Sequence, residues 1–217
     1  MFVYRNCYVE AESEKTKGKL MPSQGLCPSA QGRLREHTRV RVLACFLFLL
    51  TACASMTGTP PKKSTILPDV PFFKQEDYQC GPAVLATVID YWHRRTGKGA
   101  RVTPEQIVPE IYSPTARGVL GIDLEIYAKK HGFPGRQFAG KVTDLREAVD
   151  QGIPPIILVD YGLGFYQQGH FMVVTGYGPE GIIVNSGPHE NRFISEKDLD
   201  RIWKKTGYWT FILLPPV

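Results

Sequence analysis

A cysteine in the sequence Gln79-Cys80-Gly81-Pro82 has the surroundings expected of a nucleophile. Gly81 permits a tight turn of the backbone, and Pro82 suits the first turn of a helix, where its missing N–H would have no intrahelical acceptor. Cys80 would therefore begin a helix, among backbone amides and the positive end of the helix dipole, which both favour a thiolate. We predict that Cys80 is a nucleophile; the alternative is a structural thiol at a helix start.

A thiol nucleophile needs a base within hydrogen-bond reach, and four histidines follow the predicted leader described below. His93 lies beside two arginines at a predicted helix end, His131 precedes a helix-stopping glycine, and His189 lies in a Gly-Pro loop. His170 opens the apolar strand of residues 170–174, where it would be held rigidly and could still face a cleft. We therefore predict that His170 is the base.

A third residue usually orients the imidazole of such a pair. Asn185 follows His170 by fifteen residues and ends the second strand of a predicted hairpin, so adjacent antiparallel strands could place the two side by side. Ordinary chemistry of the Asn-Ser-Gly-Pro turn would explain the same residue. The backbone N–H of Cys80 and the side chain of Gln75 or Gln79 could form an oxyanion hole.

The elements that must position these residues are indicated by periodicity and capping signals. Helices are expected over residues 82–92, from Thr103-Pro104 onward, over 122–131 and 144–151, and briefly from Ser195. Strands are expected over residues 155–160, 170–177, 181–185 and 208–214, and the turn 178–181 would join the second and third. Helices first and a mostly antiparallel sheet afterwards predict an α+β fold for one domain of residues 66–217.

Four segments carry a resemblance to a known family: residues 71–73, 75–83 and 170–177, and the turn at Asn185. They look like parts of the double-glycine leader peptidases, which are papain-like cysteine peptidases that process bacteriocin precursors. The likeness is greatest to the stand-alone lipoprotein relatives of that family, and it covers roughly residues 66–217. It implies a papain-like cysteine peptidase fold.

The resemblance also implies roles for individual residues. Cys80 would be the nucleophile, His170 the base, and a Gln side chain an oxyanion donor. Gln75 is preferred for that donor over Gln79, whose side chain would point away from Cys80. Asn185 stands where the family usually has Asp, and an Asn can orient the imidazole but brings no charge to it. The sequence shows neither the transporter helices nor the ATPase of many members, so the resemblance does not imply leader processing during export.

The amino-terminal part of the chain reads as a secretory leader. Four arginines precede an apolar run over residues 42–50, which is about half the ~20 residues needed to span a bilayer. The run ends in Leu-Thr-Ala-Cys53, which looks like a bacterial lipobox. That resemblance implies cleavage before Cys53, diacylglycerol on its side chain and retention at a membrane. The alternatives are an ordinary signal or a buried helix with an incidental cysteine.

The predicted boundaries follow from this leader. Residues 1–52 would be the leader with its lipoprotein signal, of which residues 1–32 are polar and unpatterned and suggest a start codon chosen too far upstream. Residues 53–65, rich in Gly, Pro and Lys, would be a tether between lipid and domain. Cys80 would then be the one cysteine of the mature domain besides the lipidated Cys53, so no disulfide is expected.

Charge and composition limit the class of partner. The chain carries a formal charge of +5, but residues 1–52 hold eight Lys or Arg and four Asp or Glu, so the remainder has 18 basic and 17 acidic side chains. No basic stripe argues for nucleic acid. A metal or cofactor is not expected, and we expect a monomer.

The sequence as a whole predicts an exported, membrane-anchored cysteine peptidase that hydrolyses peptide bonds through a Cys80–His170–Asn185 site and faces the periplasm or the cell surface. Two alternatives stay open: a papain-like cell-wall amidase, and a peptide-binding module without catalysis. The sequence leaves open the substrate, and the choice between inner and outer membrane.

Overall fold

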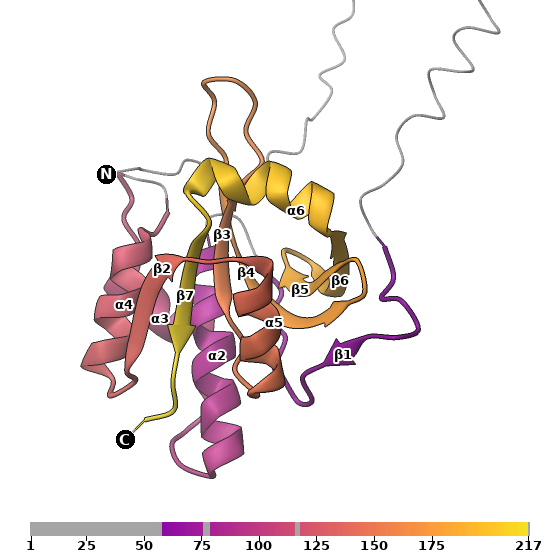
Figure 1. Ribbon diagram of the computed structural model, residues 1–217. Coiled ribbons are helices and arrows are strands. Elements are labelled where there is room, and N and C mark those ends of the chain that lie inside the picture. The colour runs from indigo at the N-terminus through magenta and orange to yellow at the C-terminus, as the bar shows by residue number, and fades with distance from the viewer. Residues whose placement is uncertain (1–57, 76–78, 116–117, 217) are drawn as a thin grey trace, which may run out of the picture. The chain divides into compact units, whose positions relative to one another are not determined.

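Three helices come before most of the strands in the chain, as the sequence predicts. The computed structural model describes residues 58–75, 79–115 and 118–216, and Figure 1 shows their elements. The helices are α2 (Cys80–Thr96), α3 (Pro104–Ile111) and α4 (Gly121–Lys130). Gln106 Oε1 accepts a hydrogen bond from Thr103 N–H at 2.9 Å, which confirms the predicted start of α3.

The strands form one antiparallel sheet in the order β2-β7-β3-β4-β5-β6, and β1 pairs with β4. They are β1 (Thr65–Ile66), β2 (Gly135–Ala139), β3 (Ile156–Asp160), β4 (Gly169–Gly178), β5 (Gly181–Ser186), β6 (His189–Ser195) and β7 (Trp209–Leu213). Helix α5 (Val142–Asp150) follows β2, and α6 (Glu196–Trp203) with the short 3-10 helix η2 (Lys204–Thr206) precedes β7. The predicted α+β fold, helices first and an antiparallel sheet after, is confirmed.

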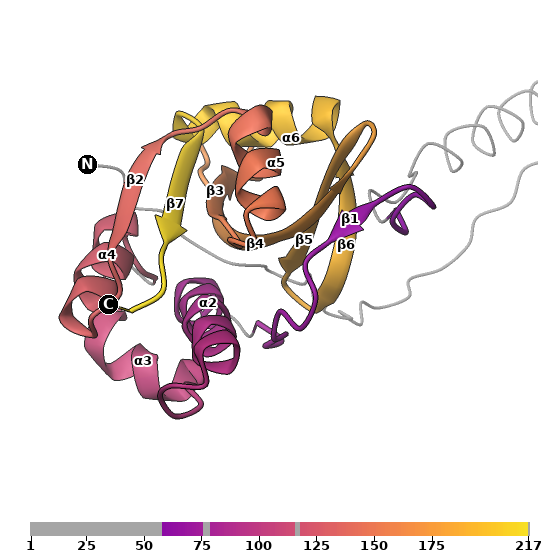
Figure 2. The same ribbon diagram turned by 60° about the horizontal axis from the view of Figure 1, so that its bottom comes forward.

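Strand β4 separates two apolar cores. Phe171 and Val173 belong to the core that includes α2, whereas Met172 and Val174 belong to the core that includes α5 and α6. Figure 2 shows α2 and α3 on one side of the sheet and α5 and α6 on the other. Because successive side chains of a strand point to opposite faces, His170 shares the α5–α6 face with Met172 and Val174.

Two edge strands were not predicted. Strand β2 pairs with β7 and β6 pairs with β5, and both carry many polar side chains that are exposed or half-buried. Edge strands need little apolar alternation, because one side and much of one face stay in contact with solvent. The Gly-Pro segment before His189, read as a loop, is the turn that leads into β6.

Part of the predicted tether lies against the sheet. Of residues 53–65 the structure describes 58–65, where Gly58 forms a bridge with Phe193 and Thr65 pairs with Tyr177. The described part of this segment is therefore packed on the domain. The predicted leader, residues 1–52, and Cys53 lie outside the described residues. Within the part of the chain that is described, none of the helices is both long enough and apolar enough to cross a bilayer.

Candidate active site

Cys80 is the first residue of α2, as the sequence predicts, and its side chain is buried. Pro82 lies in the first helical turn, also as predicted. Gly81, however, lies inside the helix and does not form a tight turn. An added Cβ at Gly81 would lie 2.9 Å from the Cβ of Val119 and 3.1 and 3.3 Å from its two Cγ atoms. Gly81 is therefore needed for the close approach of the helix start to Val119.

Replacing Gly81 with alanine is expected to displace the start of α2. Overpacking of this kind costs about 1–3 kcal/mol, so the denaturation midpoint should fall and alkylation of Cys80 should change in rate. Urea unfolding and peptide mapping of the alkylated thiol measure the two effects. In a Val119→Gly background, residue 119 has no side-chain carbons for the added methyl to contact. The free-energy cost of Gly81→Ala should therefore be smaller in that background. An equal cost in both backgrounds would show that Val119 is not the cause.

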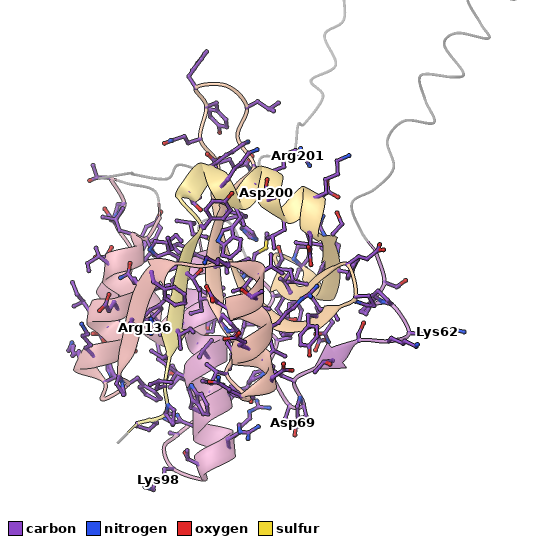
Figure 3. All side chains as sticks on the ribbon, in the orientation of Figure 1. Lys62, Asp69, Lys98, Arg136, Asp200 and Arg201 are labelled. Atoms are coloured by element: carbon purple, nitrogen blue, oxygen red, sulfur yellow. The ribbon has the colours of Figure 1, made fainter. Side chains whose placement is uncertain are left out.

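The predicted base lies at the same end of the sheet as the predicted nucleophile. Helix α2 packs against β4, and His170 is the second residue of that strand. In Figure 3, Lys98, which lies two residues beyond α2, is at the lower end of that helix, so α2 begins at the upper end. The loop that joins β3 to β4 emerges at the same upper end in Figure 1, directly before His170. The fold thus brings Cys80 and His170 to the same end of the sheet, at the starts of α2 and β4, with α2 on one face and the His170 position on the other.

The imidazole of His170 is held by a residue that the sequence reasoning did not select. Its Nε2 lies 3.0 Å from the Oγ of Ser186, the last residue of β5. The ring of Tyr161 is tilted against the imidazole, with ring centroids 5.9 Å apart. His170 and Ser186 are 6% and 4% exposed, so their hydrogen bond is shielded from water.

Asn185 does not lie beside His170, in contrast to the predicted arrangement. Its partner across the hairpin is Val173, three residues along β4. Its Oδ1 accepts a hydrogen bond from Asn191 N–H at 2.9 Å, and its Nδ2 donates to Pro71 O at 3.5 Å. In this structure the side chain of Asn185 holds the β5–β6 turn and the segment before α2. Its role in orienting His170 stays a prediction.

The two glutamines differ in their surroundings. Gln75 Oε1 accepts from Gly187 N–H at 2.9 Å, while its Nε2 makes a long bond of 3.4 Å to Phe171 O. Gln75 therefore lies next to the residue that follows His170. Gln79 precedes α2, and its backbone oxygen accepts from Ala83 N–H at 3.0 Å. These contacts place the side chain of Gln75 at the end of the sheet where His170 lies.

Sequence comparison places these residues in a peptidase family. Residues 67–210 match the Peptidase_C39 like family, and this span includes Cys80, His170 and Ser186. The match covers more than half of the chain. The chain belongs to this family. No curated protein matches the chain.

Solved structures of C39 peptidase domains share the fold of this C39-like chain. A protein from Bacillus anthracis described as a C39-like peptidase is 18% identical, with a TM-score of 0.58, over 70% of this chain and 98% of that one. The peptidase domain of Streptococcus ComA, a bifunctional ABC transporter, is 25% identical with a TM-score of 0.52, over 67% and 98% of the two chains. A double glycine motif protease from an AMS/PCAT transporter, solved with its leader peptide, is 21% identical with a TM-score of 0.51, over 72% and 96%. The predicted papain-like fold is thereby confirmed.

An exposed apolar loop of this C39-like domain leads into His170. Leu163 and Phe165 in the β3–β4 loop are 82% and 104% exposed. The base of the loop is fixed by Asp160, whose Oδ1 accepts hydrogen bonds from the backbone N–H groups of Gly162 and Gln168, both at 2.7 Å. The loop therefore exposes apolar side chains to solvent from a fixed base that precedes His170 in the chain.

The other histidines lie elsewhere in the fold. His131 is the C-cap of α4, His93 Nδ1 contacts Ala100 O at 2.7 Å, and His189 is an exposed residue of β6. Within residues 58–75, 79–115 and 118–216, no three His, Cys, Asp or Glu side chains are grouped to hold a metal ion.

Proposed function

We propose that this chain is a membrane-anchored cysteine peptidase that acts as a monomer, with Cys80 as nucleophile and His170 as base. The observation that carries the proposal is that α2 and β4 begin at the same end of the sheet. Helix α2 begins at Cys80 and packs against β4, which begins at Gly169 and His170. Membership of a peptidase family supports the same assignment.

The chemistry that this pair can perform is acyl transfer through a thioester. His170 takes the proton of the Cys80 thiol, and the sulfur attacks the carbonyl carbon of the scissile amide. The protonated imidazole then gives its proton to the leaving amine as the C–N bond breaks. Water, deprotonated by His170, attacks the thioester and releases the acid, and the proton returns to the thiolate.

The oxyanion formed in each attack needs hydrogen-bond donors. The backbone N–H of Cys80 lies at the start of α2, at the positive end of the helix dipole, which favours a negatively charged oxygen. We assign the second donor to Gln75, because its Oε1 is fixed by Gly187 while its Nε2 makes the longer, weaker contact to Phe171. The amide nitrogen is thus the end of the side chain that a substrate oxygen can recruit.

A peptide is the substrate class that the surroundings support. One of the solved relatives was crystallised with a leader peptide. In this chain the exposed Leu163 and Phe165 lie in the loop that leads into His170 and offer apolar surface to side chains of an extended peptide.

The experiment that tests this function uses the full chain in detergent. Purified protein is offered mixed peptide libraries and muropeptides, and products are identified by mass spectrometry. Cleaved peptides support the proposal. Release of products from muropeptides alone would make the chain a cell-wall amidase. A wild-type protein that binds peptides and cleaves neither substrate would be a binding module.

The anchor is a separate part of the proposal. We propose that Cys53 carries diacylglycerol after cleavage of the leader, so that the domain faces the periplasm or the cell surface. The support is the arginine-rich stretch, the short apolar run and the Leu-Thr-Ala-Cys53 sequence.

Cys53→Ser is expected to abolish lipidation. Expressed in a bacterium, the wild-type chain should fractionate with membranes and incorporate labelled fatty acid, whereas the variant should lose the label and be released or misprocessed. Fractionation and metabolic labelling measure this. Cys45→Ser, within the apolar run, is the matched control and should keep the lipid. Wild-type protein that is soluble and unlabelled would refute the anchor.

A further inference from the structure

The geometry of the sheet points to Ser186 as the residue that positions the imidazole of His170, a role for which the sequence alone suggested Asn185. This inference rests on the proposed function, because it concerns the base of the same site. Ser186 Oγ and His170 Nε2 are 3.0 Å apart, and both side chains are buried. A hydrogen bond with this degree of burial fixes the rotation of the imidazole ring.

A bulge in β4 decides which residue of β5 reaches His170. From Gly178↔Gly181 to Gly176↔Ile183 the hairpin runs in one register, and beyond the irregularity at Thr175 it continues as Val174↔Val184 and Val173↔Asn185. Without the extra residue, Asn185 would oppose Val174 and share the face of His170. With it, Asn185 turns to the opposite face, and Ser186 lies on the face of His170.

Hydrogen bonds between β4, β5 and β6 hold the bulge in place. Thr175 Oγ1 donates to Asn191 Oδ1 at 2.8 Å and also lies 3.3 Å from Ile183 O. Asn191 N–H in turn donates to Asn185 Oδ1. Asn185 therefore acts on this register through the β5–β6 turn, and Ser186 contacts the imidazole itself.

A serine hydroxyl can donate or accept, so the contact at Nε2 allows the tautomer that the chemistry needs. When Nε2 carries the proton and donates it to Ser186 Oγ, the lone pair of Nδ1 is left to accept the thiol proton of Cys80. The hydroxyl can accept this bond in both the neutral and the protonated states of His170. Unlike a carboxylate, it adds no negative charge to stabilise the imidazolium.

The charged groups named below contact atoms other than Nε2 of His170, which Ser186 contacts. Cys80 begins α2, which packs against β4, Tyr161 contributes its ring, and Asp160 at the end of β3 uses its Oδ1 to hold the loop backbone. Helix α5 also packs on β4, but Asp150 and Arg146 contact Tyr177 and Gly178 at the other end of the strand. Each of these carboxylates is thus engaged away from Nε2.

The test compares isosteric variants in the full chain. Ser186→Thr and Ser186→Val have nearly the same shape, but only threonine keeps a hydroxyl. We expect Ser186→Val to slow alkylation of Cys80 at neutral pH, and peptide turnover, by roughly ten- to hundredfold, part of the contribution of a positioned base. Ser186→Thr should stay within about threefold of the wild type. Peptide mapping separates Cys80 from the other cysteines, and Ser186→Ala replaces valine if that variant does not fold.

Two further readouts separate positioning from a structural effect. In ¹⁵N-histidine spectra the neutral His170 of the wild type should be protonated at Nε2, and Ser186→Val should show mixed tautomers. Ser186→Asp should move the alkaline limb of the alkylation profile to higher pH, because a carboxylate stabilises imidazolium. Asn185→Ala should lower the thermal midpoint and keep the Nε2 tautomer.

The outcomes distinguish this inference from the proposed function. A wild-type pH profile and His170 spectrum in Ser186→Val, or loss of the tautomer in Asn185→Ala alone, would overturn the role of Ser186. Absence of peptide cleavage by the wild type would overturn the proposed function. The spectra and the alkylation rates would still decide on Ser186 in that case.

Discussion

Replacing Cys80 with alanine should abolish hydrolysis, because no other group at the start of α2 can form the thioester. Loss of a nucleophile from a serine hydrolase site costs about 10⁶-fold in turnover, and we expect a loss of this order here, below the detection limit of a peptide assay. The variant should still bind peptide, since the apolar loop and the sheet edge are unchanged. Product formation and peptide binding by fluorescence anisotropy measure the two effects.

A matched control for Cys80 is a second cysteine of the same chain. Cys7→Ala, in the predicted leader, should leave turnover unchanged. Covalent capture of an electrophilic peptide should be seen with the wild type and lost with Cys80→Ala. Hydrolysis that persists in Cys80→Ala would show that the chemistry lies elsewhere in the protein.

His170→Ala is the second change with a large expected effect. A positioned base contributes about 10²–10⁴-fold, so turnover at neutral pH should fall within that range. The loss should be smaller at alkaline pH, where hydroxide removes the thiol proton without a base. Added imidazole should restore part of the activity if it can enter the space that the ring leaves next to Ser186. Turnover between pH 6 and about pH 10, with and without imidazole, measures this.

His189→Ala serves as the control for this experiment. His189 is exposed in β6, close in sequence to the turn at Gly187 but outside the contacts of the imidazole. The His189→Ala variant should have wild-type turnover at every pH. If His170→Ala retained full activity, or if His189→Ala lost it, the assignment of the base would be wrong.

Local signals predicted most elements of this fold. The Thr103–Gln106 start of α3 and the 178–181 turn between β4 and β5 depend on a few adjacent residues, and the structure confirms both. Strands β2 and β6 were missed because they lie at the edges of the sheet, where polar side chains suppress the alternation that marks a strand.

The residue types by themselves determined which side chains could perform the chemistry. A cysteine before Gly-Pro and a histidine at a strand start are local patterns, and the structure places them at a helix start and a strand start as expected. The tertiary structure decided the neighbour of His170. Because side chains alternate with a period of two, the single extra residue at Thr175 moves Asn185 to one face of β5 and Ser186 to the other. Whether a hairpin contains a bulge depends on contacts such as that between Thr175 and Asn191, which join strands far apart in the sequence.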